Sequence, residues 1–344
     1  MFLYASIRFL SFMNYYILLG GIVGFLTTFF AIKWFIRYAR LIGLEVKDQN
    51  KENKPLVPLS GGICVMAGLL ISLTLFIFLN TFLGDGTFIK EGDLTFLFAA
   101  LVSIIIITFI GFTDDLLIRR DKESSAGLKQ WQKPILTLVA AIPLIVVNAG
   151  STAMSFPFFG RVDIGLLYPL LLVPIGVVGA ANMVNLLAGF NGLEAGMGLV
   201  YTGMLGLYAW SFDRHIAALI AFMTFFSLLA FLYFNKFPAK IFPGDSLTYL
   251  LGAVMASIAI LGNIEKAALI AAIPFIAEFF LKIRKKLDVK SYGYYEDGKV
   301  KSYYKEIYSL PHIFTRTGKF TEKQVTVFLI LIELFFSSLI WVIR

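Results

Sequence analysis

The segment SIIIITFIGFTDDLLIRRDK, residues 103–122, runs from apolar side chains directly into two adjacent aspartates, Asp114 and Asp115. Neighbouring carboxylates repel each other, and the repulsion is costly where water is scarce. The pair therefore indicates either Mg²⁺ binding or proton transfer from an incoming acid. The alternative is a solvated helix end whose charge is balanced by Arg119 and Arg120.

The apolar run in this segment is one of several along the chain. Hydrophobic residues make up 58% of the 344 residues and charged residues only 15%, whereas soluble domains are nearer half and a quarter. The excess falls in runs of about 20 residues, the length that spans a bilayer as a helix. No alternating pattern indicates a barrel. We therefore predict an all-α polytopic membrane protein that forms a single domain, residues 1–344.

About ten transmembrane helices are expected, after a short amphipathic lead-in with no removable signal peptide. They lie near residues 14–36, 59–83, 94–112, 133–148, 164–184, 198–211, 216–234, 246–262, 266–283 and 324–343. Most of the 30 Lys and Arg residues fall in the loops after odd-numbered spans. Because cytoplasmic loops are enriched in Lys and Arg, these loops are predicted to be cytoplasmic and both termini to lie outside a cell membrane.

The last cytoplasmic loop, residues 284–323, is predicted to contain a small β-hairpin. The pair Asp297-Gly298 separates two segments in which aromatic and polar residues alternate, and this is a hairpin signal. We expect strands near 291–295 and 299–304. The tyrosines of these strands are alternatively anchors at the membrane surface.

A second polar group, in the segment NMVNLLAGFNGLEAG, contains Asn182, Asn185 and Asn191. Asparagine offers donors and an acceptor without charge, which suits a metal, a phosphate or a base edge at a helix break. The alternative is hydrogen bonding between membrane helices.

A third group, in KIFPGDSLTYLLG, follows the turn Pro243-Gly244 with Asp245 at the start of a span. This carboxylate is a candidate metal ligand, and the structural alternative is an N-cap. Basic segments hold His312, Arg316 and Lys51, which are candidates for binding an anionic ligand. Taken alone, these segments favour an ordinary basic cytoplasmic face.

Together these groups form an inventory of acids and bases on the predicted cytoplasmic face, as phosphoryl transfer requires. No Walker-type loop is present. The competing class is a transporter of anionic substrates, since polar residues in spans often mark pathways. Against it, the acids gather at one face. Glu278 is the exception, and it is expected to pair with Lys282 four residues later.

The motifs FTDDLL, NMVNLLAGFNGLEAG and IFPGDS, in this order over nearly the whole chain, resemble those of the polyprenyl-phosphate N-acetylhexosamine-1-phosphate transferases. The resemblance implies transfer of N-acetylglucosamine-1-phosphate from UDP-N-acetylglucosamine to a polyprenyl phosphate such as dolichyl phosphate, with release of UMP. It implies Mg²⁺ as cofactor, with Mn²⁺ as an alternative ion. No nucleic-acid partner is expected, and a homodimer is left open.

The resemblance also implies roles for individual residues. Asp245 matches the metal ligand, and Asn185 the residue that helps to hold the metal and the pyrophosphate. Asp114 and Asp115 match the acidic pair near the lipid phosphate, and Lys133 matches the lysine that meets the phosphates. Asn191 and Phe242 match the uridine contacts, with Phe242 as the stacking face. His312, with Arg316, matches the C-terminal histidine motif.

Several departures separate this chain from the bacterial phospho-N-acetylmuramoyl-pentapeptide transferase branch, which remains the alternative assignment. The second motif has Ala-Gly-Phe-Asn-Gly at 188–192 where that branch has Asp-Gly-Leu-Asp-Gly, and Ile313 follows His312 in place of further histidines. Both departures favour the dolichyl-phosphate N-acetylglucosaminephosphotransferase branch. Ile118 occupies a position that is polar in many members.

Overall fold

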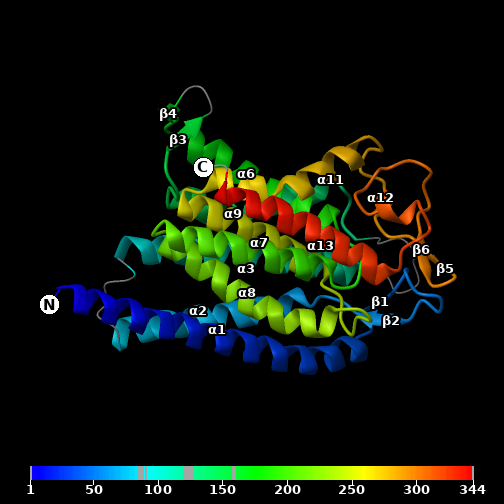
Figure 1. Cartoon of the computed structure of the whole chain (residues 1–344), viewed down its shortest axis with the longest axis horizontal. Helices are drawn as coiled ribbons and strands as arrows, with labels where there is room; N and C mark the ends of the chain where they lie inside the picture. The colour runs from blue at the N-terminus through cyan, green and yellow to red at the C-terminus, as the bar shows by residue number, and fades with distance from the viewer. Residues whose placement is uncertain (1, 84–88, 90, 119–126, 157–159, 343–344) are drawn as a thin grey trace.

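The computed structural model describes residues 2–83, 89, 91–118, 127–156 and 160–342. Long helices run side by side along the long axis of the molecule (Figure 1). The longer helices are listed here in chain order: α1 (Phe2–Leu41), α2 (Gly62–Phe82), α3 (Glu91–Leu117), α6 (Val173–Leu186), α7 (Leu193–Ser211), α8 (His215–Asn235), α9 (Gly244–Gly262), α11 (Ile273–Ile283) and α13 (Glu322–Ser338). The shorter helices are α4 (Gln132–Val139), α5 (Ile142–Val146), α10 (Glu265–Ala271), α12 (His312–Thr315), the π-turn η1 (Tyr168–Leu172) and the 3₁₀ turn η2 (Leu339–Trp341).

Seven helical segments in the described part of the chain are long and apolar enough to cross a membrane. They are 15–41, 62–82, 92–117, 168–186, 215–235, 244–262 and 322–341. The expected count of ten spans is not confirmed. Two of the remaining predicted spans are broken helices, α4 with α5 and α10 with α11, each with a proline at the start of its second piece. Proline lacks an N–H and disfavours helical geometry in the residue before it. The third, α7, has 19 residues, but glycine and polar residues dilute its apolar content.

Helix α9 is the central element of the bundle. In its most apolar stretch of 18 residues 78% of the residues are buried, against 33% in the corresponding stretch of α1. It packs against α3, α6, α7 and α8. Close packing in membranes relies on small residues, and a Cβ atom at Gly111 of α3 would lie 2.4 Å from the backbone oxygen of Asp245. Gly111 therefore brings the end of α3, with its two aspartates, against the start of α9.

Three two-stranded antiparallel sheets lie in the connecting segments: β1 (Glu45–Lys47) with β2 (Leu56–Pro58), β3 (Ala153–Phe156) with β4 (Gly160–Asp163), and β5 (Tyr294–Glu296) with β6 (Lys299–Lys301). The last of these confirms the predicted hairpin, with Glu296 opposite Lys299 and positive φ at Asp297 and Gly298. Its strands are shorter than predicted. The other two pairs were not expected from the sequence.

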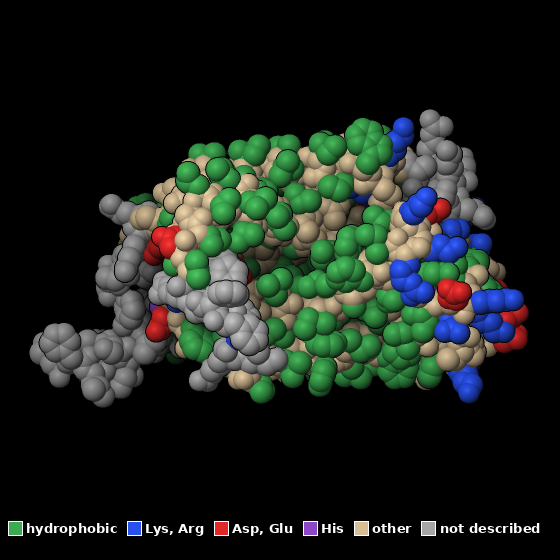
Figure 2. Space-filling model, turned by 90° about the horizontal axis from the view of Figure 1, so that it is seen from above, with side chains coloured by type: hydrophobic (Ala, Val, Ile, Leu, Met, Phe, Trp, Pro, Cys, Tyr) green, Lys and Arg blue, Asp and Glu red, His purple; other side chains and the backbone are tan. Residues whose placement is uncertain are grey.

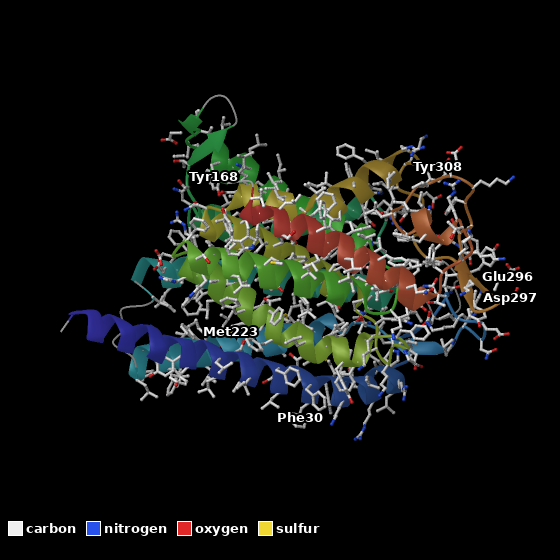
Figure 3. All side chains as sticks on the ribbon, viewed as in Figure 1. Phe30, Tyr168, Met223, Glu296, Asp297 and Tyr308 are labelled. Atoms are coloured by element: carbon white, nitrogen blue, oxygen red, sulfur yellow. The ribbon has the colours of Figure 1, made fainter. Side chains whose placement is uncertain are left out.

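The two ends of the bundle differ. Hairpin β5–β6, with Glu296 and Asp297 at its turn, lies at the end called here the hairpin end (Figure 3). Helix α1 begins and α13 ends toward the opposite end (Figure 1). Lys and Arg side chains gather at the hairpin end, while the flank of the bundle is covered with hydrophobic side chains (Figure 2).

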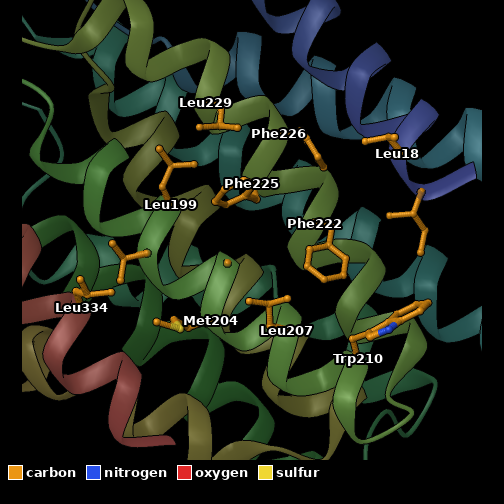
Figure 4. Close-up of a pocket in the computed structure, with 13 residues that line it drawn as sticks. Leu18, Leu199, Met204, Leu207, Trp210, Phe222, Phe225, Phe226, Leu229 and Leu334 are labelled. Carbon is orange, nitrogen blue, oxygen red and sulfur yellow. The ribbon is translucent and has the colours of Figure 1, made fainter. Parts of the chain in front are cut away.

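The flank also has an apolar hollow of about 870 Å³ between α1, α7 and α8. Phe222 and Trp210 lie on its wall (Figure 4). An apolar flank beside a charged end is the surface expected of a protein whose sides contact lipid.

Candidate active site

Residues of the three sequence motifs meet Lys133, which the family resemblance singled out, at the hairpin end, where Tyr292 lines the adjoining cavity. Asp114 and Asp115 lie in the last turn of α3, and Lys133 lies in the first turn of α4. Asn185 lies in the last turn of α6, and Asp245 lies in the first turn of α9. Four helices that are far apart in the sequence therefore contribute to one cluster.

Lys133 joins two of the acids. Its Nζ lies 2.6 Å from Asp114 Oδ2 and 2.7 Å from Asp245 Oδ2. The side chains of Asp114 and Lys133 are almost withdrawn from solvent, with exposed fractions of 1% and 15%. One ammonium group thus compensates two carboxylates, of which Asp114 is buried and Asp245 is 21% exposed, and which would otherwise repel each other.

Asp115 has a different environment. It is fully buried, and Ser60 Oγ donates to its Oδ2 at 2.7 Å. The backbone N–H groups of Asp245 and Ser246 donate to its carboxylate at 2.7 and 3.3 Å. These two N–H groups belong to the first turn of α9, whose own N-cap is Pro243 and provides no side-chain cap. Asp115 therefore supplies from α3 the capping acceptor that this helix start requires.

The alternative interpretation of the aspartate pair, a solvated helix end, is wrong because both carboxylates are buried. Arg119 and Arg120, the cations proposed to balance that charge, lie outside the described residues. The alternative for Asp245 also changes, since the N-cap is Pro243 and Asp245 lies in the first turn.

Asn185 Nδ2 donates to Asp245 Oδ2 at 3.1 Å, and Thr248 Oγ1 donates to Asn185 Oδ1 at 3.0 Å. This amide therefore belongs to the charged cluster. Asn182, one turn earlier on α6, donates instead to Thr137 Oγ1 of α4 at 3.1 Å. That bond is of the interhelical type considered as an alternative for this motif.

A cavity of about 240 Å³ opens beside the cluster. Asn185, Thr248 and Asp245 lie on one side of it, and Phe242 and Asn191 also line it. The backbone of Phe242 is held at both ends, since its N–H donates to Pro58 O at 2.7 Å and its carbonyl accepts from Gly61 N at 2.9 Å. The cavity thus combines an aromatic face, amide groups and a carboxylate in a fixed frame.

A second polar cluster supports the cavity wall. Asn191 Nδ2 donates to Asp48 Oδ2 at 3.0 Å, and Asn191 N donates to Glu322 Oε1 at 2.9 Å. Lys51 pairs with Glu322 and lies 3.1 Å from Asp48 Oδ2. Its ammonium also lies 4.3 Å from the centre of the Phe237 ring. In this arrangement Lys51 compensates two buried acids; binding of a substrate by Lys51 stays a prediction.

His312 is fully buried at the start of α12. Its Nδ1 accepts from the backbone N–H of Tyr308 at 3.2 Å, so Nε2 carries the proton and donates to Lys290 O at 3.0 Å. Burial lowers the pKa of His312 below its ordinary value. The ring thus fastens the last loop, whereas Arg316 is exposed at the end of α12. Contact of either residue with a substrate stays a prediction.

The donor set fits a divalent ion. Carboxylate and amide oxygens are the hard ligands that Mg²⁺ prefers, and Mg²⁺ usually takes one or two protein carboxylates and completes its shell with phosphates and water. Asp114 and Asp245 already share one cation, the ammonium of Lys133. Within the described ranges no three His, Cys, Asp or Glu side chains form a metal cluster of their own.

Four supporting residues were missed by the sequence analysis: Ser60, Asp48, Glu322 and Thr248. Ser60 stands in LSGGI, Asp48 in KDQNKENKP and Thr248 one turn after Asp245. The local signal at each position is that of a loop or a helix turn. Packing of α3, α6 and α9 gives Ser60 and Thr248 their partners, whereas Asp48 and Glu322 meet Asn191 and Lys51 where α13 begins.

The model of glycosyl transferase family 4 matches residues 97–263. A protein of Saccharolobus solfataricus, provisionally named UDP-N-acetylglucosamine–dolichyl-phosphate N-acetylglucosaminephosphotransferase, is 33% identical over 93% of this chain and 94% of its own length. One of Sulfolobus acidocaldarius with the same provisional name is 34% identical over 94% of each chain.

A Dictyostelium discoideum protein named UDP-N-acetylglucosamine–dolichyl-phosphate N-acetylglucosaminephosphotransferase is 27% identical over 86% of this chain and 79% of its own. These similarities confirm the resemblance seen in the motifs. They extend over the helices that bring Asp114, Lys133, Asn185 and Asp245 together. The chain therefore belongs to glycosyl transferase family 4.

Proposed function

We propose that this protein transfers N-acetylglucosamine-1-phosphate from UDP-N-acetylglucosamine to dolichyl phosphate in a Mg²⁺-dependent reaction. An oxygen of the lipid phosphate attacks the β-phosphorus of the nucleotide sugar. A new P–O bond forms, the bond between the β-phosphorus and the bridging oxygen breaks, and UMP leaves with that oxygen. The names of the three relatives support this donor and this acceptor.

The observation that carries the proposal is the cluster of Asp114, Lys133, Asn185 and Asp245 beside a cavity. Phosphoryl transfer depends on positioning and on compensation of negative charge rather than on covalent chemistry by the protein. A lysine held between two carboxylates, next to an amide and an aromatic face, provides both.

The donor is assigned to the 240 Å³ cavity. Uracil stacks on Phe242 and bonds to Asn191, and the pyrophosphate lies toward Asn185 and Lys133, which donate to its oxygens. Asp245, with Asn185, would hold the Mg²⁺ ion. When bound, the ion supplies positive charge that lets two anionic substrates approach and compensates the leaving UMP.

The acceptor's phosphate needs little help from a base, because the second pKa of a phosphate monoester is about 6. Asp114 and Asp115 are therefore assigned to positioning the cluster. An apolar groove of about 310 Å³ between α6, α9, α10 and α11 follows the flank of the bundle. We assign the prenyl chain to this groove, since it adjoins α6, which carries Asn185 at its end.

The chain is proposed to cross the membrane ten times, with α4–α5, α7 and α10–α11 completing the seven long apolar segments. In support, consecutive elements run back and forth between the hairpin end and the opposite end (Figure 1). The gathering of Lys and Arg at the hairpin end supports a cytoplasmic site with both termini outside.

The test is UMP release by membranes containing the protein, supplied with UDP-N-acetylglucosamine, dolichyl phosphate and Mg²⁺. Release that requires both substrates, with label recovered in lipid, is expected. Activity only with UDP-N-acetylmuramoyl-pentapeptide would favour the muramoyl branch. Uptake of the sugar nucleotide without UMP release would favour a transporter and overturn the proposal.

A further inference from the structure

A buried ion pair lies between the candidate active site and the last loop, in α11. Glu278 is fully buried and Lys282 is 5% exposed, and Lys282 Nζ lies 3.4 Å from Glu278 Oε1. The pairing expected from their spacing is confirmed. A buried ion pair is weak evidence for stability, because desolvation offsets much of the attraction. The contacts that surround the pair indicate what it does.

Lys282 contacts the end of α6. Its Nζ donates to the carbonyl of Leu186 at 2.5 Å and to Ser291 Oγ at 2.7 Å. Ser291 Oγ in turn donates to the same carbonyl at 3.2 Å. Leu186 is the last residue of α6, so its carbonyl is one of those that a helix end leaves without a partner. A cation at this position also interacts favourably with the helix dipole.

Glu278 contacts the last loop. Its Oε1 accepts from Ser309 Oγ at 2.6 Å and its Oε2 from the backbone N–H of Leu310 at 2.7 Å. The pair thus ties this loop, just before His312, to the end of α6.

The residues on the two sides of Leu186 belong to the candidate active site. Asn185, immediately before it, donates to Asp245. Ala188, Gly189 and Asn191, shortly after it, line the cavity. The Leu186 carbonyl, which Lys282 contacts, therefore lies where α6, the helix that carries Asn185, ends and the segment that lines the cavity begins.

We infer that Lys282, oriented by Glu278, is a positioning residue for the nucleotide-sugar side of the site. It acts through the Leu186 carbonyl on Asn185 and on the segment 187–191. This inference rests on the proposed function for its substrate, UDP-N-acetylglucosamine. It concerns the nucleotide sugar, because the segment that follows Leu186 lines the 240 Å³ cavity.

The test compares Lys282→Met with the full-length wild-type protein in nanodiscs, with Lys305→Met as the control. Lys305 is exposed in the last loop, and its variant loses the same charge. In hydrogen exchange without any substrate, the amides of 186–191 are expected to exchange at least about tenfold faster in Lys282→Met and at the wild-type rate in Lys305→Met. Unchanged exchange in that segment would overturn the inference.

Kinetics provides a second measurement. KM for UDP-N-acetylglucosamine is expected to rise about tenfold in Lys282→Met, which corresponds to about 1.4 kcal/mol, while KM for dolichyl phosphate stays unchanged. A merely structural role would lower kcat through a smaller active fraction and leave both KM values as they were, and that result would refute positioning. Lys282→Arg keeps the charge, and its KM for UDP-N-acetylglucosamine is expected to lie between those of the wild type and Lys282→Met.

The two failures are distinguishable. If the wild-type protein releases no UMP, the proposed function fails, and the exchange experiment still decides the role of Lys282. If the wild-type protein is active and neither exchange nor KM changes in Lys282→Met, the proposed function stands and the positioning role fails.

Discussion

Replacement of Asp115 by Asn tests whether this buried carboxylate acts on a substrate or caps α9. The substitution keeps the size of the side chain but turns one acceptor oxygen into an NH₂ group. In the structure all the named partners of Asp115 are donors: Ser60 Oγ and the N–H groups of Asp245 and Ser246. An NH₂ group would therefore face a donor whichever way the amide turns.

The magnitude follows from these contacts. A hydrogen bond to a charged group contributes about 1.5–3 kcal/mol, and a buried donor left without a partner costs about 1–3 kcal/mol. Asp115→Asn removes the charge from three bonds and leaves at least one donor unsatisfied, so a loss of about 3 kcal/mol is expected. With an unfolding entropy of about 2.1 cal/mol/K per residue, this corresponds to a fall of about 4 °C in the melting temperature.

The assay is thermal unfolding of the purified protein together with binding of UDP-N-acetylglucosamine and UMP release. Capping predicts that stability, nucleotide-sugar binding and turnover all decrease, because Asp245 moves with the start of α9. Ser60→Ala, which removes one donor, is expected to cause a smaller loss of about 1 kcal/mol. Asp297→Asn, in the exposed hairpin turn, is the matched control and is expected to change nothing.

The refuting result is equally specific. If Asp115→Asn unfolds at the wild-type temperature and binds the nucleotide sugar normally but loses turnover, Asp115 acts on the acceptor and its role is not the cap. That outcome would restore the catalytic assignment suggested by the family resemblance.

Three further predictions concern charge. Lys133→Met leaves Asp114 and Asp245 without their shared cation, so UMP release should fall at least about 100-fold. Lys129→Met, at an exposed position, is the control, and equal activity in the two variants would contradict the assignment. Chelation of divalent ions should abolish UMP release, and addition of Mg²⁺ or Mn²⁺ should restore it. The Asp245→Asn variant should need a higher ion concentration for the same activity. UMP release that persists after exhaustive chelation would exclude a role for the metal. The pKa of His312 is lowered by burial, so below its ordinary value of about 6.5 the unfolded state binds more protons than the folded state. Stability should thus be constant above that pH and decrease as the pH falls through it, with a shallower decrease in His312→Gln; parallel profiles would disprove a role for the buried ring.

The sequence determined the local elements of this protein. Apolar runs of about 20 residues predicted most of the long helices, and Asp297-Gly298 predicted the hairpin at its observed position. The breaks between α4 and α5 and between α10 and α11 also have local causes, at Pro143 and Pro274. Each of these two predicted spans is therefore formed by two short helices rather than by one.

The motifs likewise predict Asp114, Asn185 and Asp245 as site residues, and the family resemblance adds Lys133. Each residue type carries the chemistry that the site needs, and family resemblance linked them. Their positions in the chain do not show that the four side chains share hydrogen bonds and one ammonium group. Lys133 and Asp245, for example, are in contact although they lie 112 residues apart in sequence.

Only the tertiary structure decided what the individual carboxylates do. Asp114 and Asp115 are neighbours in sequence, yet one pairs with Lys133 and the other caps α9, because successive residues of a helix point in different directions. Sequence periodicity reports which residues share a face of one helix, but not which helix lies against it. In a membrane that choice depends on close packing of small residues such as Gly111 and on polar contacts between helices, and these arise only when the whole bundle is assembled.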